Sequence, residues 1–173
     1  YSCLDGGADP TMPGEATSTA ESIEIDFDGE QVLIDGVDVT DEIRSPEVTE
    51  AASRVSVHPG VREAMVTEQR RLISAGRYVA EGRDIGTVVS PDSPLKVFLT
   101  ASEEVRAERR AGQTGGDAAE ILLSQRERDR RDTEREHGAL KVADDAVEID
   151  TSGLSLDEVV EKIAALARER DLT

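Results

Sequence analysis

Apolar and acidic residues alternate strictly near the beginning of this chain. In the segment IEIDFDGEQVLIDGVDVT, residues 23–40, alternate positions from Ile23 to Phe27 are apolar, and Asp28-Gly29 supplies a turn before the alternation resumes. This pattern around an Asp-Gly pair predicts an antiparallel β-hairpin with one solvated face. We expect the hairpin to form a small insert over residues 22–44.

Two helices are predicted after the hairpin. The segment RSPEVTEAASRVSV begins the first, because Ser45 suits the N-cap and Pro46 the first helical position. The segment HPGVREAMVTEQRRLISAG, residues 58–76, repeats apolar residues at helical spacing, and Gly76 suits its end. Residues 1–21 are rich in Gly, Pro, Ser and Thr without a period, so we expect an irregular acidic segment there.

Three further apolar runs predict strands that alternate with helices. The runs are YVAEGRDIGTVV, LKVFLT and AVEID, and the helical segments are SEEVRAERRAG, capped by Ser102, AAEILLSQRERDRRDTER and an amphipathic C-terminal helix. Five residues of that last helix are expected to face inward: Leu156, Val159, Val160, Ile163 and Leu166. Alternating strands and helices imply the α/β class, with a parallel sheet covered by helices, over residues 45–173.

Composition supports one domain, or a core with a small insert, that resides in a reducing compartment. The 173 residues include 37% apolar but only 2% aromatic residues, so aliphatic side chains must fill the interior. A single cysteine, Cys3, excludes an internal disulfide. No apolar stretch approaches ~18 residues, and no signal peptide opens the chain. We therefore expect a cytoplasmic protein without a membrane partner, and a monomer.

The charge is strongly negative but unevenly distributed. The net charge of −18 argues against a nucleic-acid partner, which requires a basic surface. Residues 1–43 contain 12 acidic residues and no Lys or Arg, whereas residues 44–135 contain 16 residues of each sign. Arginine accounts for 17 of the 20 basic residues, and its planar fork binds phosphate through two hydrogen bonds. Arg-rich codon usage would explain the ratio equally well, but not the clustering.

The turn GRDIG, residues 82–86, is the first candidate site. In an open parallel sheet, ligands bind outside the carboxyl ends of the strands, where we expect this turn to lie. Its glycines would let a ligand approach the backbone, Arg83 could hold a phosphate, and Asp84 could accept hydrogen bonds from an amino group or a sugar. A solvated surface ion pair remains the alternative.

Two arginine clusters are further candidates. Arg128, Asp132 and Arg135 share one face of a predicted helix, and this face carries excess positive charge that an anion would neutralise. In RAERRAGQTGGD, arginines precede a glycine-rich hinge, as in a lid that closes over phosphates. The alternatives are a solvated helix laced with ion pairs and an ordinary exposed helix end.

Long segments taken together resemble one enzyme family. The segments YVAEGRDIGTVVSPDSPLKVFLTAS, RERDRRD and AVEIDTSGLSLDEVVEKI, in this order and spacing, resemble bacterial cytidylate kinases, which phosphorylate CMP and dCMP with ATP. The hairpin resembles the insert of that family's CMP-binding region, and the resemblance spans about residues 22–170. It implies the fold of P-loop nucleoside monophosphate kinases, small-molecule nucleotides as partners, ATP as phosphoryl donor, Mg²⁺, and a lid near residues 106–127.

The resemblance also assigns roles to individual side chains. By position, Ser53, Arg62 and Asp84 match residues that contact the cytosine base, and Asp132 matches one that orients the sugar. Arg83, Arg128 and Arg135 match residues that hold the acceptor phosphate. Arg109 and Arg110 match the start of the lid. Arg109, Arg110 and Arg128 are therefore the expected catalytic residues, and no metal ligand is assigned.

One family motif is missing from the printed sequence. The phosphate-binding loop G-x-x-x-x-G-K-[ST], which holds the donor phosphates and Mg²⁺, does not occur, because none of Lys96, Lys141 and Lys162 follows a glycine. We expect this chain to be a fragment that is inactive alone. A non-catalytic remnant that keeps the CMP pocket is the alternative function, and a purely structural domain, which leaves the arginine face unexplained, is the third.

Overall fold

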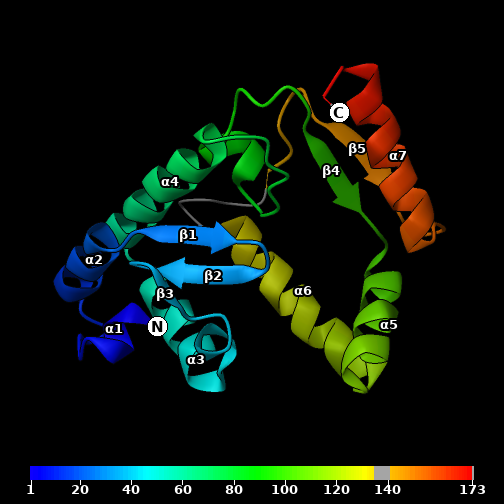
Figure 1. Ribbon diagram of the computed structural model, residues 1–173. Coiled ribbons are helices and arrows are strands. Elements are labelled where there is room, and N and C mark those ends of the chain that lie inside the picture. Colours follow the sequence, from blue (N-terminus) through cyan, green and yellow to red (C-terminus); the bar gives the residue numbers. More distant parts are fainter. Residues whose placement is uncertain (135–140, 173) are drawn as a thin grey trace. The chain divides into compact units, whose positions relative to one another are not determined.

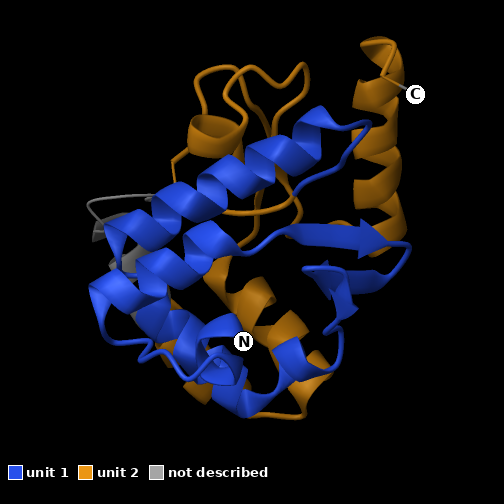
Figure 2. Ribbon diagram, turned by 60° about the vertical axis from the view of Figure 1, so that its left-hand side comes forward, with its two compact units in different colours: residues 1–80 blue, residues 81–173 orange. Residues whose placement is uncertain are grey.

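The structure is a computed structural model that describes residues 1–134 and 141–172. The side chains at positions 127, 128 and 130–134 lie outside the description. The chain is rich in helix and forms two compact units, residues 1–80 and 81–173 (Figure 2). The predicted functional boundaries at residues 21/22 and 44/45 are a different division and stay predictions.

The first unit combines helices with a small antiparallel sheet (Figure 1). In chain order its elements are α1 (Ser2–Asp5), α2 (Pro13–Ser22), β1 (Ile25–Asp28), β2 (Gln31–Ile34), β3 (Val37–Asp38), the short 3₁₀ helix η1 (Glu42–Arg44), α3 (Pro46–Val55) and α4 (Pro59–Ser74).

The predicted hairpin is confirmed. Strands β1 and β2 pair antiparallel with Ile25 opposite Ile34 and Phe27 opposite Val32, and β3 extends the sheet on the other edge of β2. Gly29 and Gly36 turn the chain with positive φ angles of 59° and 77°. Side chains at these positions would be strained, so the two glycines fix where the strands end.

The predicted helix starts are also confirmed. The Ser45 hydroxyl accepts a hydrogen bond from the backbone N–H of Val48 at 3.3 Å, as an N-cap should, and Pro46 opens α3. Helix α4 ends at Ser74, two residues before the predicted stop at Gly76.

The prediction of an irregular segment over residues 1–21 is wrong. Helix α2 begins with Pro13 at its first position, carries Glu15 in its first turn, and buries Ala16 at 1% exposure. It packs against α4 so closely that a Cβ atom at Gly60 would lie 2.5 Å from Thr17 Oγ1. The composition of this segment did not indicate the helix, because the tertiary contact with α4 stabilises it rather than intrinsic helix propensity.

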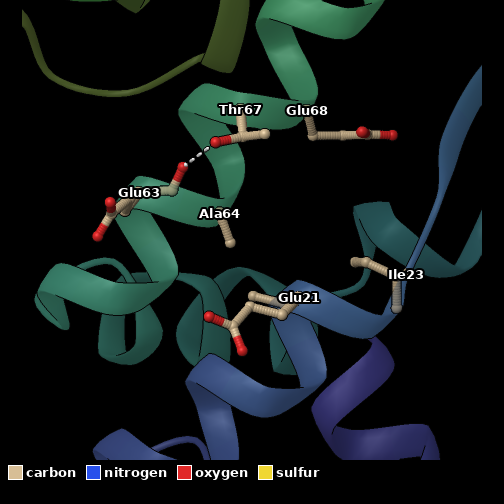
Figure 3. Close-up of a pocket in the computed structure, with 7 residues that line it drawn as sticks. Glu21, Ile23, Glu63, Ala64, Thr67 and Glu68 are labelled. Atoms are coloured by element: carbon tan, nitrogen blue, oxygen red, sulfur yellow. Dashed lines mark hydrogen bonds between the residues drawn. The ribbon is translucent and has the colours of Figure 1, made fainter.

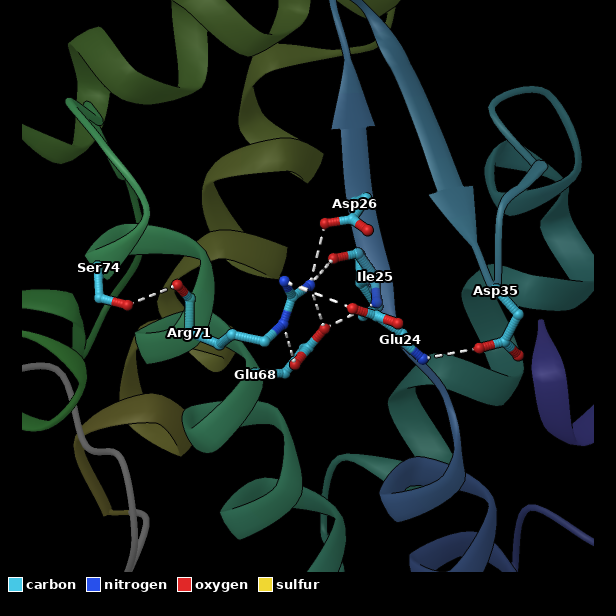
Figure 4. A network of polar contacts seen from close by, with 7 residues as sticks. All are labelled: Glu24, Ile25, Asp26, Asp35, Glu68, Arg71 and Ser74. Atoms are coloured by element: carbon cyan, nitrogen blue, oxygen red, sulfur yellow. Dashed lines mark hydrogen bonds and ion pairs between the residues drawn. The ribbon is translucent and has the colours of Figure 1, made fainter.

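A polar network joins α4 to β1 (Figure 4). The Glu68 carboxylate accepts from the backbone N–H of Ile25 at 2.7 Å and from Arg71 at 2.8 and 2.9 Å. The same guanidinium donates to the Ile25 carbonyl at 2.5 Å and to Asp26 at 3.1 Å. Glu68 is only 14% exposed, so its hydrogen bonds are shielded from water and hold the first strand to the helix.

Acid should weaken the first unit through Glu68. Hydrogen bonds from Arg71, and then from the Ile25 N–H, hold the pKa of Glu68 below its usual value of 4.5, although partial burial opposes them. A folded pKa below the unfolded pKa means that this stabilisation is present above pH 4.5 and is lost as the pH falls through the folded pKa. Below pH 4.5, the urea midpoint should therefore fall more steeply in wild type than in Glu68→Gln.

Glu63→Gln is the matched control, because Glu63 lies on the same helix, is exposed and takes no part in the network. Its urea midpoint should follow the wild-type acid dependence. If Glu68→Gln also followed it, the network would not be the source of the acid sensitivity.

The second unit holds a short parallel ladder and three longer helices among its described residues. Its elements are the π-helical turn η2 (Ile85–Val89), β4 (Val97–Thr100), α5 (Glu103–Thr114), α6 (Ala118–Glu134), β5 (Val147–Asp150) and α7 (Leu156–Glu169). Throughout the described part of the chain, every helix is too short or too polar to cross a membrane.

Two of the three predicted strands are confirmed as a parallel pair. Val97 lies opposite Val147 and Leu99 opposite Ile149, so these four aliphatic residues share one face of the ladder. Lys96, just before β4, has a side chain only 8% exposed and pairs with Asp145 at 2.8 Å, just before β5. This ion pair fixes the amino ends of both strands.

The prediction of a strand over YVAEGRDIGTVV is wrong. Residues 77–82 run without strand pairing, Val79 is fully exposed, and Ile85–Val89 forms a π-helical turn. A parallel strand needs backbone partners, and among the described residues no strand pairs with this segment. Apolar content therefore misidentified the local structure.

The predicted inward face of the C-terminal helix is partly wrong. Val159, Ile163 and Leu166 are half-buried, but Leu156 is 78% and Val160 56% exposed. Leu156 lies in the first turn of α7, and Val160 lies four residues later on the same side of the helix. The start of the helix is fixed instead by a capping box, in which Ser155 and Glu158 bond each other's backbone N–H.

Candidate functional site

The GRDIG turn is organised around the backbone carbonyl of Asp84. This oxygen accepts from the N–H groups of Val88 at 2.8 Å, Val89 at 3.2 Å and Thr87 at 3.3 Å. The Asp84 side chain is half-buried, while Arg83 is exposed. Single π-helical turns occur often at functional sites, so this geometry is compatible with the predicted role of the turn.

The glycines of the turn are packed closely by their neighbours. A Cβ atom at Gly82 would lie 2.7 Å from Ile85 Cγ1, which no ordinary contact allows. A Cβ atom at Gly86 would lie 3.4 Å from Lys96 Cδ. A side chain at 82 would therefore force Ile85 to shift, a packing reason for glycine that is separate from the predicted approach of a ligand.

The carboxyl ends of β4 and β5 are bonded to each other. The Thr151 N–H and hydroxyl both donate to the Thr100 carbonyl, at 2.8 and 2.9 Å, and the Ser102 N–H donates to Ser152 Oγ at 2.9 Å. Thr151 is 6% exposed. This is the sheet edge at which open α/β folds bind ligands.

Arg109, predicted to be catalytic, has structural partners at this edge. Its guanidinium donates to Thr151 Oγ1 at 3.0 Å, to the Thr151 carbonyl at 2.6 Å and to the Leu154 carbonyl at 3.2 Å. These bonds hold α5 to the turn between β5 and α7. Its catalytic role stays a prediction, and it would require the guanidinium to leave these three acceptors.

The predicted lid region forms a hairpin of two helices. Helix α5 continues through Gly112 to Thr114, and the chain turns at Gly115, whose φ is 72°, so the break comes three residues later than the first glycine of GQTGG. Arg110 is exposed on α5. Asp117 starts α6 by accepting from the N–H groups of Ala119 and Glu120.

The predicted arginine face of α6 is described only in part. Positions 128 and 132 lie on the helix, but their side chains are outside the description. Arg135 lies outside the described residues. Whether Arg128, Asp132 and Arg135 converge therefore stays a prediction.

The two remaining predicted residues belong to the first unit. Ser53 is exposed on α3, and its carbonyl accepts from the Ser56 hydroxyl at 3.0 Å. Arg62 is half-buried near the start of α4. Arg83 and Asp84 belong to the second unit. Ser53 and Arg62 are therefore described within the first unit, and Arg83 and Asp84 within the second.

Two cavities among the described residues contain none of the residues that the sequence assigned to substrate. One, of about 300 Å³, lies between α2 and α4, and its lining residues include Glu21, Glu63 and Glu68 (Figure 3). It would repel a nucleotide phosphate. The other, of about 370 Å³, lies at the amino ends of β4 and β5 and includes Gly86, Lys96 and Lys141.

Metal-binding side chains do not gather anywhere in the described part of the chain. No three of its His, Cys, Asp or Glu residues are arranged to hold an ion. No Mg²⁺ ligand is assigned among these residues.

Comparison with known proteins decides the family. The family model described as cytidylate kinase matches residues 1–169. The chain belongs to the cytidylate kinase family. The match includes residues 1–21, which the resemblance seen in the sequence did not cover, and this agrees with the ordered helix α2 found there.

Curated cytidylate kinases are similar over most of the chain. The cytidylate kinase of Rhodococcus opacus (strain B4) is 48% identical over 170 residues, covering 94% of this chain and 74% of that protein. That of Geobacillus sp. (strain WCH70) is 48% identical over 147 residues, covering 82% and 66%. A bifunctional pantoate ligase/cytidylate kinase of Synechococcus sp. (strain WH7803) is 45% identical over 175 residues, covering 95% and 36%.

Membership in the cytidylate kinase family implies the fold of P-loop nucleoside monophosphate kinases. The described elements contribute a two-stranded parallel ladder and a small antiparallel sheet to that architecture. The network of Glu68 and Arg71 had no signal in the sequence, because its partners lie more than 40 positions apart.

Proposed function

We propose that this protein is a (d)CMP kinase that transfers the γ-phosphoryl group of ATP to CMP or dCMP, giving ADP and CDP or dCDP. The observation that carries this proposal is the cytidylate kinase match over residues 1–169. An oxygen of the CMP phosphate attacks the γ-phosphorus, and the bond from that phosphorus to the β–γ bridging oxygen breaks. No covalent protein intermediate is needed.

Arginine side chains would hold the acceptor phosphate. Arg83 from the GRDIG turn, with Arg128 and Arg135 from the later arginine cluster, would neutralise its charge and aim one oxygen at the donor. Asp132 would orient the sugar. The acidic composition of the rest of the chain makes this arginine-rich stretch the part best suited to an anionic substrate.

Three side chains would recognise the base. The half-buried Asp84 carboxylate would accept from the exocyclic amino group of cytosine, while Ser53 and Arg62 would bond its ring acceptors. In this assignment the GRDIG turn addresses both ends of one nucleotide, because Asp84 reads the base and Arg83 holds the phosphate.

The lid would act on the phosphoryl group during its transfer. Both lid arginines are exposed, but the Arg109 guanidinium is bonded to Thr151 and Leu154, so Arg110 is the better candidate. Closure over the phosphates would exclude water and stabilise the developing charge.

Mg²⁺ would accompany ATP and neutralise charge on its phosphates. No residue of this chain is assigned as a ligand of Mg²⁺, and no catalytic step is assigned through the metal.

A comparison of CMP with cytidine tests this proposal directly. CMP at 100 times its dissociation constant should stabilise the product of the complete gene by about 2.7 kcal/mol, which thermal unfolding detects. Cytidine at the same concentration should stabilise it much less, because it lacks the phosphate. Equal shifts, or the absence of CDP formation from ATP and CMP, would overturn the proposed function.

The remnant alternative has no support from the family match or the relatives, which are kinases by name. Inactivity of the 173-residue chain on its own stays a prediction. Assaying this chain beside the product of the complete gene tests it. The expected monomeric state and cytoplasmic location also stay predictions.

A further inference from the structure

We infer that the ion pair between Arg106 and Asp129 positions the substrate-binding face of α6. This inference rests on the proposed function, since it concerns the helix that carries Arg128 and Asp132. Arg106 and Asp129 are positioning residues in this account, because they act through that face and not on substrate.

Helices α5 and α6 follow one another in the hairpin (Figure 1), and described side chains make polar contacts between them. Arg106 Nη1 lies 2.7 Å from Asp129 Oδ2, and the backbone carbonyl of Arg106 accepts from Gln125 Nε2 at 3.5 Å. A second ion pair joins Arg126 to Glu103 at 2.6 Å. These contacts come from one side of α6, the side that faces α5.

Helical periodicity places the substrate positions beside this contact and not within it. At about 100° per residue, positions 128 and 132 lie roughly 60–100° round the axis from position 129, both on the same side. The Arg106 contact therefore fixes the rotation of α6 at the turn where the substrate positions lie. A small rotation there would move a phosphate-binding group by enough to lose its hydrogen bonds.

The two ion pairs differ in burial. The side chains of Arg106 and Asp129 are 35% and 31% exposed, whereas those of Arg126 and Glu103 are 52% and 44% exposed. The less exposed pair is less screened by water and adjoins position 128 directly. The Arg126 pair can therefore serve as a control within the same helical hairpin.

The sequence explains why the contact is specific. Arg106 lies one helical turn after the N-cap Ser102. The start of α5 therefore fixes the position of Arg106 relative to the end of β4. Asp129 is one of two acidic residues in the run RERDRR, and basic residues stand directly before and after it. A carboxylate at this place both pairs with α5 and lowers the repulsion within the run.

The test is steady-state kinetics on the product of the complete gene, with CMP and ATP varied separately. Asp129→Asn and Arg106→Gln should each raise the KM for CMP by roughly ten- to a hundredfold and change the KM for ATP by less than about twofold. Glu103→Gln should leave both values within about twofold. The charge-swapped double variant R106D/D129R should recover most of the lost affinity for CMP.

Each outcome decides between a positioning role and a merely structural one. If Asp129→Asn lowers the melting temperature but leaves the KM for CMP unchanged, the pair only joins the helices. The same conclusion follows if Glu103→Gln raises the KM for CMP as much as Asp129→Asn does. A double variant no better than the single variants would also overturn the inference. Arg106→Lys keeps the charge and should leave the KM for CMP near the wild-type value, and Asp129→Asn carries the test should Arg106→Gln not fold. A wild type without CMP turnover overturns the proposed function instead.

Discussion

Replacing Arg128 with alanine is expected to lower kcat/KM for CMP by about a thousandfold, the low end of what one arginine contributes to phosphoryl transfer. A guanidinium can hold two phosphate oxygens at once, so its loss removes both charge neutralisation and orientation of the attacking oxygen. A coupled assay that follows ADP release measures this loss in the product of the complete gene. Arg128→Lys should recover only part of it, because an ammonium cannot bind bidentately.

Arg126→Ala is the matched control for that substitution. Arg126 lies two positions earlier on α6, and its guanidinium pairs with Glu103 at 2.6 Å, on the side that faces α5. Its removal takes the same charge and side-chain size from the same helix, but we expect less than about a fivefold effect on kcat/KM. If Arg128→Ala fell within the same limit, the arginine face would be an ordinary solvated helix surface.

Local sequence patterns were sufficient to predict structural features that depend only on neighbouring residues. The hairpin follows from alternation and from glycines at positive φ, and the starts of α3 and α5 follow from the N-caps Ser45 and Ser102. Each of these features is decided within a few residues. Pattern-based prediction is strongest for structure of this kind.

Features that depend on long-range contacts could not be predicted from local sequence patterns. Helix α2 is stabilised against α4, with Gly60 allowing a close approach to Thr17, and no local pattern announces a contact over 40 residues. The segment around Val79 has strand-like composition, but among the described residues it has no strand partner. Strand formation depends on pairing as well as on apolar content.

The candidate site shows the same division. The residue types and their order sufficed to recognise the family, which the match over residues 1–169 confirms. The side-chain partners were not predictable: Arg109 binds the turn after β5, 42 or more positions away, and Arg106 binds Asp129. Whether an arginine contacts substrate or scaffold depends on the folded chain.

Asp84→Ala is expected to weaken CMP binding more than it weakens binding of the phosphate alone. Losing a hydrogen-bond partner in a closed pocket costs roughly 1–3 kcal/mol, which corresponds to about a 5- to 150-fold higher dissociation constant. Isothermal titration of the product of the complete gene with CMP measures this change. The affinity for inorganic phosphate, which Arg83 and Arg128 would bind, should stay within about twofold of wild type.

The substitution should leave the turn itself intact, because the backbone carbonyl of Asp84, and not its side chain, accepts from Thr87, Val88 and Val89. An unchanged circular dichroism spectrum checks this. UMP provides the chemical control, since uracil carries a carbonyl oxygen where cytosine carries an amino group, and a carboxylate repels that oxygen. Asp84→Ala should therefore reduce the preference for CMP over UMP, and Asp84→Asn, whose amide can also donate, should reduce it further. A preference that survives both substitutions would assign base recognition to other residues.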